Sequence, residues 1–103
     1  MGDNIQEITM ETKLSANPNL VLREEEEGGA ILFDPETGSV RLLNSTAAAI
    51  YKLLDGRRML SAVKEALKEG FDNLGADAEK QIMDLVRELH RMGAVGTIAE
   101  FPK

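Results

Sequence analysis

The stretch that most constrains the fold is residues 39–56, which read SVRLLNSTAAAIYKLLDG. The alternating side chains of residues 39–43 are typical of a β-strand. Residues 44–45 are Asn and Ser, whose side-chain oxygens can accept hydrogen bonds from the unpaired N–H groups at a helix start. Apolar residues at spacings of three and four favour a helix over residues 45–54, and Gly56 suits a left-handed helix end. A strand therefore leads directly into a helix here.

Before this stretch the sequence predicts short strands separated by turn-forming residues. Residues 20–23 and 30–33 have strand patterns, and residues 24–29, four Glu followed by two Gly, separate them. Residues 34–38 contain Pro and Gly and lead into the strand at residues 39–43. Because both connections are short, we expect an antiparallel meander in which residues 30–33 are central and the other two strands are edges.

After this stretch the patterns are helical. Residues 60–69 and 77–93 predict two further helices, residues 72–76 form a loop between them, and residues 94–98 form a short extra strand. Strands followed by helices indicate an α+β domain.

The length of 103 residues fits one domain. Pro18 restricts the residue before it and marks the start of that domain. We therefore expect a mobile N-terminal arm over residues 1–16, the domain over residues 17–98 and a tail over residues 99–103.

The helix over residues 77–93 has more apolar surface than one contact needs. The stripe expected to face the core comprises Ala78, Ile82, Leu85, Leu89 and Met92. A second stripe beside it comprises Glu79, Met83, Val86 and His90. Two interpretations of the second stripe stay open. Met83 and Val86 either widen the core contact or form the half-exposed wall of a groove, a role that suits the flexible Met side chain.

Composition and charge argue against several classes of protein. The formal net charge of −6 disfavours a ligand with a phosphate backbone. There is no Cys, which excludes disulfides and thiolate metal sites. No apolar run approaches the roughly 20 residues that cross a bilayer, and the N-terminal sequence lacks the pattern of a secretory signal. We therefore expect a cytoplasmic protein that contacts no membrane.

No set of residues suggests catalysis. His90 is the only imidazole of the chain, and its place near a helix C-terminus favours a partly solvated role. It has no carboxylates at metal-ligand spacing, and no Ser stands in a nucleophile motif. No Gly-rich phosphate-binding pattern occurs either. We therefore expect a protein that is not an enzyme and holds neither metal nor cofactor.

The strand-to-helix stretch also carries a family pattern, with Leu43 and Asn44 before the helix and Asp55 and Gly56 after it. Other positions of the pattern are Pro18, residues 32–34, Pro35, Gly38, Val40, Ala47, Ile50, Leu53, Leu67, Phe71, Leu85, Leu89 and Gly93. In these residues the chain resembles the PqqD-like family. Members of this family are small domains that recognise the leader segment of ribosomally made precursor peptides (RiPP recognition elements).

The resemblance implies a winged-helix-like fold, with a three-stranded antiparallel sheet followed by three helices. It implies that a leader peptide adds as a strand beside residues 39–43, in a groove against the last helix. The residues of this site would be Val40, Arg41, Leu42 and Leu43, with Met83, Val86 and His90 opposite. The domain would act as a peptide chaperone that presents the leader to a modifying enzyme, often a radical S-adenosylmethionine enzyme, as in coenzyme PQQ synthesis.

Two other functions stay open, because a fold does not determine a function. A winged-helix nucleic-acid-binding protein needs a basic recognition helix, whereas residues 77–93 balance basic side chains against acidic ones. A small structural subunit without a peptide ligand is the second alternative. Exposed strand edges also leave a homodimer open.

Overall fold

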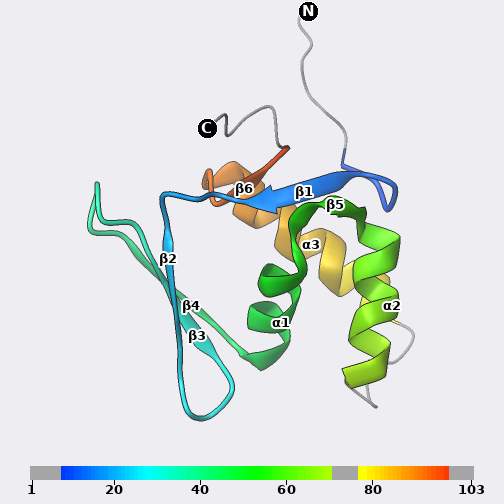
Figure 1. Ribbon diagram of the computed structural model, residues 1–103, viewed down its shortest axis with the longest axis horizontal. Coiled ribbons are helices and arrows are strands. Elements are labelled where there is room, and N and C mark those ends of the chain that lie inside the picture. Colours follow the sequence, from blue (N-terminus) through cyan, green and yellow to red (C-terminus); the bar gives the residue numbers. More distant parts are fainter. Residues whose placement is uncertain (1–7, 71–76, 98–103) are drawn as a thin grey trace, which may run out of the picture.

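The computed structural model describes residues 8–70 and 77–97, and Figure 1 shows a helical body from which one sheet projects. The elements are β1 (Lys13–Ala16), β2 (Val21–Glu24), β3 (Ala30–Phe33), β4 (Val40–Leu43), α1 (Ser45–Leu53), β5 (Asp55–Met59), α2 (Leu60–Gly70), α3 (Ala78–Arg91) and β6 (Val95–Gly96). The projecting sheet has the order β2-β3-β4 and is called the wing. The other sheet, β5-β1-β6, lies across one end of the helices and is called the cap sheet. The expected α+β fold is confirmed.

The wing is the antiparallel meander that the sequence predicts. β3 pairs with β2 on one side and with β4 on the other, so that Leu32 lies opposite both Leu22 and Arg41. In the turn between β3 and β4, the Gly38 N–H donates to the carbonyl O of Asp34 at 2.7 Å. Gly38 has a φ of +79°, which glycine adopts without a steric penalty. The turn thus leads from the central strand β3 to β4, which is an outer strand of the wing.

The three helices lie where the sequence predicts them, with bounds within two residues. α1 begins after Asn44, whose Oδ1 accepts a hydrogen bond from the Ala47 N–H at 2.8 Å. α3 ends before Gly93, which has a φ of +79° and donates from its N–H to the carbonyl O of His90 at 3.0 Å. Local capping therefore accounts for the start of α1 and for the end of α3.

The cap sheet corrects the expectation of a mobile arm for residues 13–16, whereas residues 1–7 of that arm lie outside the described residues. Residues 13–16 form β1, which pairs antiparallel with β5 on one side and with β6 on the other. Leu14 of β1 belongs to the buried core. The sequence does not reveal this sheet because β1, β5 and β6 are short and lie far apart along the chain. β6 falls within the strand expected at residues 94–98, whereas β5 was not expected.

The face of α3 that meets the core also differs from the expected one. Its buried centre comprises Ile82, Val86 and Leu89, and Val86 is 0% exposed. Leu85 is only half-buried and Met92 is 51% exposed, although both were expected to face the core. Neighbouring apolar stripes on a helix differ by a small rotation, so the elements that pack across the helix decide which stripe is central.

Two further expectations, the loop over residues 72–76 and the tail over residues 99–103, lie outside the described residues. Of the helices that the structure describes, none has the length and apolar character that crossing a membrane requires.

Candidate functional site

β4 presents backbone hydrogen-bonding groups along one edge. Among the described strands, only β3 pairs with it. The Asp34 N–H donates to the carbonyl O of Ser39 at 2.9 Å, and bonded and non-bonded pairs alternate along an antiparallel ladder. This alternation places Val40 and Leu42 at positions whose N–H and C=O groups point away from β3. β4 therefore offers the backbone groups of two residues to an added strand.

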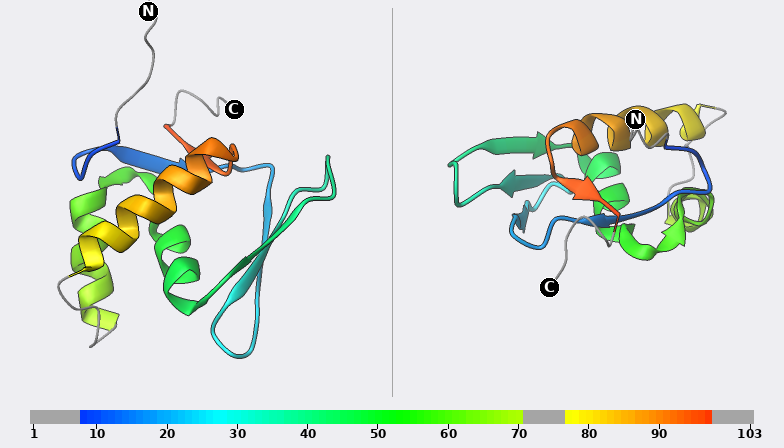
Figure 2. Two further views of the ribbon diagram at one scale, coloured as in Figure 1. Left: turned by 180° about the vertical axis from the view of Figure 1, so that it is seen from behind. Right: turned by 90° about the horizontal axis from the view of Figure 1, so that it is seen from above.

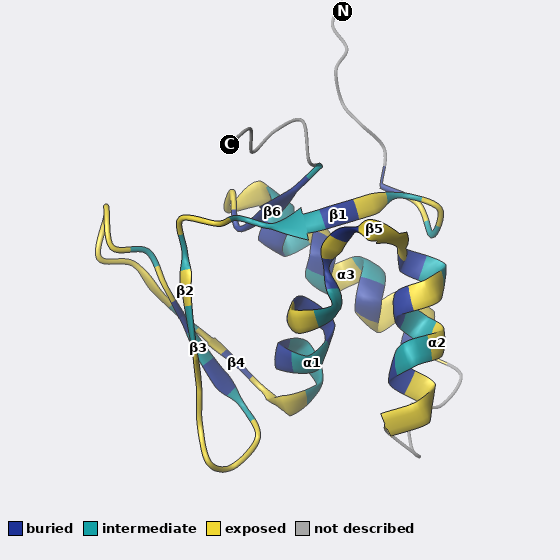
Figure 3. Ribbon diagram, viewed as in Figure 1, coloured by how far each residue is buried: buried dark blue, intermediate teal, exposed yellow. Residues whose placement is uncertain are grey.

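The side chains of β4 alternate between the two faces of the wing. Val40 and Leu42 are on the outer face, 58% and 73% exposed. Arg41 and Leu43 are on the inner face, where Leu43 is buried and Arg41 is half-buried. Figure 3 shows the same contrast, with much of the wing exposed and burial concentrated where the elements of the body meet. A strand added to β4 would have its inward side chains next to the body.

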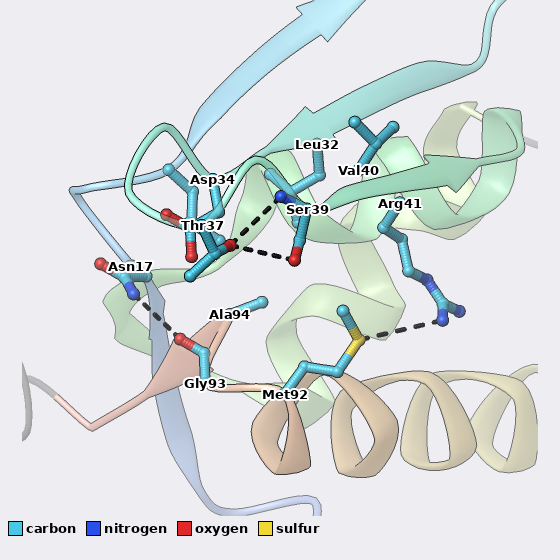
Figure 4. Close-up of a pocket in the computed structure, with 11 residues that line it drawn as sticks. Asn17, Leu32, Asp34, Thr37, Ser39, Val40, Arg41, Met92, Gly93 and Ala94 are labelled. Atoms are coloured by element: carbon cyan, nitrogen blue, oxygen red, sulfur yellow. Dashed lines mark hydrogen bonds between the residues drawn. The ribbon is translucent and has the colours of Figure 1, made fainter.

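One hollow lies between the wing and the body, and a second lies between two helices of the body. The turn-side hollow, about 500 Å³, lies by the β3–β4 turn and is shown in Figure 4. Its lining residues are Asn17, Leu20, Leu32, Asp34, Thr37, Ser39, Val40, Arg41, Met92, Gly93 and Ala94. The helix-side hollow, about 400 Å³, lies between the start of α1 and α3. Its lining residues are Asn44, Thr46, Ala47, Ile50, Gln81, Asp84, Leu85 and Glu88.

An ion pair lies at the boundary between the two hollows. Arg41 lines the turn-side hollow, Glu88 lines the helix-side hollow, and Nη1 of Arg41 donates to Oε2 of Glu88. The same Nη1 is 3.9 Å from Sδ of Met92, the contact drawn in Figure 4. The hydrogen bond from Arg41 holds the pKa of Glu88 below its ordinary value, and the charges of Arg41 and Arg91 add to this effect. The pair connects β4 of the wing to α3 of the body.

The predicted site is only partly assembled at this place. Val40, Arg41 and Leu42 lie on the open strand of the wing, as expected. Leu43 and Val86 are buried in the core, so neither is an exposed wall of the groove.

Met83 and His90 lie on the flank of α3 that faces away from β4. Glu79, one turn before Met83, forms an ion pair of 4.0 Å with Lys64 of α2, so this flank faces α2. Neither Met83 nor His90 lines the two hollows described above. The expected place of these residues opposite β4 is therefore corrected, and the cause is the rotation of α3 about its axis.

The residues of α3 and its C-terminal end that line the two hollows were missed as a group. Gln81, Asp84, Leu85 and Glu88 line the helix-side hollow, and Met92 lines the turn-side hollow. Leu85 and Met92 had been assigned to the core stripe. One signal was present in the sequence: Arg41 shares the inner face of β4 with the buried Leu43, and a half-buried cation needs an acidic partner across the gap. Glu88 is that partner.

The hollows lack the features of a metal site. Within residues 8–70 and 77–97, no three His, Cys, Asp or Glu side chains are grouped to bind a metal ion.

Burial raises the pKa of Tyr51 to about 12. The Tyr51 hydroxyl is 3.4 Å from the carbonyl O of Ala94 and donates to it, which connects α1 to the segment before β6. Tyr51 therefore has a structural role.

Two comparisons with known proteins gave a match. The family model "Coenzyme PQQ synthesis protein D (PqqD)" matches residues 29–95. A solved structure, described as "TbiB1 in Complex with the TbiA(beta) Leader Peptide", is similar with a TM-score of 0.66 at 16% identity, covering 79% of this chain and 93% of that chain. At this identity the likeness concerns the fold. A comparison with curated proteins gave no match.

A three-stranded wing with an open edge beside the last helix defines a small winged-helix-like α+β domain. The match of the family model extends from the residue before β3 to the start of β6, which is more than half of the chain. The chain belongs to the PqqD family.

Proposed function

We propose that this protein binds the leader segment of a ribosomally made precursor peptide as an added strand on β4. The observation that carries the proposal is the edge of β4 with which no further described strand pairs, next to the turn-side hollow and connected to the helix-side hollow through the ion pair of Arg41 with Glu88. Membership in the PqqD family supports it, and the protein of similar fold is described in complex with a leader peptide. In strand addition, main-chain bonds give affinity and pockets for alternate side chains give specificity.

The geometry of β4 suggests how the peptide would lie. Its backbone would pair with Val40 and Leu42, whose N–H and C=O groups point away from β3. Its inward side chains would enter the hollows next to Leu85 and Met92, and its outward side chains would continue the exposed row of Val40 and Leu42. The α3 residues of the site are then Leu85, Glu88 and Met92, in place of Met83, Val86 and His90.

The energetics of such a complex favour moderate affinity. Main-chain bonds contribute roughly 0.5–1.5 kcal/mol each, and each apolar side chain that enters a hollow adds roughly 1.5–3 kcal/mol. Ordering of the peptide and loss of its free motion oppose binding by several kcal/mol. The difference corresponds to a Kd near the micromolar range, about −8 kcal/mol.

The protein would act on its peptide without catalysing a reaction. His90, the only imidazole of the sequence, does not line either hollow. The chemistry would come from a separate modifying enzyme, and a radical S-adenosylmethionine enzyme is the partner that we propose. Presentation of a freshly made precursor would take place in the cytoplasm, where ribosomes make it. The net charge of −6 disfavours nucleic acid as an alternative ligand.

A second copy of the chain would compete for the same edge. β2 and β4 are both outer strands of the wing, and unpaired strands can add to one another. We propose that any homodimer formed through β4 dissociates when peptide binds. Light scattering with and without peptide measures this directly.

The test is an NMR titration of labelled protein with peptides selected on it from a display library of short random peptides. The amides of Val40 and Leu42 and the methyl groups of Leu85 should shift together. Replacement of Glu25, in the β2–β3 loop, by Ala serves as the control and should leave binding unchanged. Shifts centred on β2 with β4 unaffected would contradict the proposed edge.

A further inference from the structure

Arg41 has hydrogen-bonding capacity that its present partner does not use. It is the only charged residue of β4, and its side chain is 28% exposed. Its hydrogen bond to Glu88 comes from Nη1, while Nε is buried and has no hydrogen-bond partner in the described part of the chain. A guanidinium group presents its donors as a planar fork that suits a carboxylate bound through both oxygens. In the described part of the chain, one hydrogen-bond donor of Arg41 therefore has no acceptor.

The position of Arg41 places this unused capacity where an added strand would pass. Residues directly opposite each other on neighbouring strands project to the same face of the sheet. The peptide residue opposite Arg41 would therefore project inward, toward α3 and the boundary between the two hollows. The carboxylate of Glu88 now lies at this boundary.

Glu88 can leave this position while keeping its charge. Its side chain is 43% exposed, compared with 28% for Arg41, so water can solvate the released carboxylate. Arg91, one turn further along α3, also attracts Glu88. The less exposed Arg41 would lose more if it were left without an acceptor.

We propose that Arg41 is a specificity-determining residue that selects peptides with Asp or Glu at the position opposite it, and that Glu88 occupies the place of this carboxylate until a peptide binds. This inference deepens the proposed function and depends on it. A peptide carboxylate would release Glu88 to water and accept from an Nη atom, and from Nε as well once the Arg41 side chain turns toward the added strand. An apolar or amide side chain would leave the guanidinium with a poorer partner.

The experiment is a selection of short random display peptides on four proteins: the wild type, Arg41→Gln, Glu88→Gln and the double variant Arg41→Glu/Glu88→Arg. Peptides selected by the wild type should carry Asp or Glu at one fixed position relative to their apolar residues. Arg41→Gln should keep the apolar preference and lose the acidic one. The double variant keeps an ion pair of reversed polarity and should select Lys or Arg at the same position.

Affinities of one selected peptide then give the size of the effect. Replacing its acidic residue by the matching amide should weaken binding to the wild type about tenfold, and binding to Arg41→Gln less than about threefold. Glu88→Gln removes the internal competitor and should bind the acidic peptide about threefold more tightly than the wild type. Denaturation curves confirm that each variant folds.

The outcomes separate this inference from the proposed function. If the wild type selects peptides that shift the Val40 and Leu42 amides but show no acidic preference, the role of Arg41 is refuted and peptide binding stands. The same conclusion follows if the double variant keeps the acidic preference. If no selected peptide perturbs β4, the proposed function itself fails and the inference fails with it.

Discussion

The two three-stranded sheets of this protein contrast in how they form and in what they leave exposed. The wing is made of consecutive strands joined by short turns, whereas the cap sheet joins residues 13–16, 55–59 and 95–96. In the cap sheet, β1 is central and its Leu14 is buried. In the wing, β4 lies at the edge and its Leu42 is the most exposed large apolar residue of the described chain. Figure 2 shows the two sheets at different sides of the helical body.

This contrast suggests that the cap sheet mainly stabilises the fold and that the wing mainly binds the ligand. The cap sheet contributes core residues from distant parts of the chain and holds the ends of the fold together. The wing is attached through its inner face and through ion pairs such as Arg41 with Glu88 and Lys52 with Glu24, the latter at 2.9 Å. An exposed apolar row beside an unpaired edge adds little to stability, and it is where a ligand strand would gain the most contacts.

The largest expected effect is on stability in the cap sheet. Leu14→Ala should lower the free energy of unfolding by about 2–5 kcal/mol, because it leaves a cavity in the core. The matched change in the wing, Leu42→Ala, should alter it by less than about 0.5 kcal/mol, because the side chain is exposed. Chemical denaturation measures both. Equal losses would mean that the cap sheet and the wing do not differ as we describe.

The next effect concerns the two flanks of α3. Leu85→Ser removes an apolar side chain from the helix-side hollow and should weaken binding of a selected peptide about tenfold. The matched change Met83→Ser, on the flank that faces α2, should alter binding less than about threefold. Fluorescence titration measures both Kd values. A stronger effect at Met83 than at Leu85 would restore the flank predicted from the sequence.

A smaller effect should separate the two kinds of backbone position in β4. Leu42→Pro removes an N–H that points away from β3, so it should weaken peptide binding about threefold to tenfold and leave the wing folded. Leu43→Pro removes an N–H that points toward β3 and should unfold the wing instead. Hydrogen exchange of the β3 amides reports on the wing. Loss of their protection in Leu42→Pro would show that the N–H of Leu42, and not that of Leu43, points toward β3.

The smallest effect is the pH dependence of the connection between wing and body. The pKa of Glu88 is depressed in the folded protein, so its contribution to stability is complete above the ordinary pKa of Glu, roughly 4.3. The contribution is lost as the pH falls through the lower, folded pKa. The difference in unfolding free energy between the wild type and Glu88→Gln should therefore shrink with acidification. A difference that stays constant down to strongly acidic pH would contradict the pairing with Arg41.

Local patterns account for the parts of the fold that the sequence predicted. The period-2 alternation over residues 39–43 and the capping side chain of Asn44 act within a few residues of one another, so the strand, the helix start and their order follow without a partner. The same holds for the turn at Gly38 and for the three helices. For the candidate site, local reasoning predicted that residues 39–43 form an edge strand, and the family resemblance named Val40, Arg41 and Leu42 on it.

The sequence by itself therefore determined the meander, with its central strand and two edges, and the helices, because hydrogen bonds and caps between near neighbours produce these features. Only the tertiary structure decided that residues 13–16 form the central strand of the cap sheet, because its partners are distant in the chain. It also decided the rotation of α3, which buries Val86, places Leu85 in the hollow between α1 and α3, and turns Glu88 and Met92 toward Arg41 of the wing. Two adjacent apolar stripes differ by a small angle on a helix, and only the surfaces packed against it select between them.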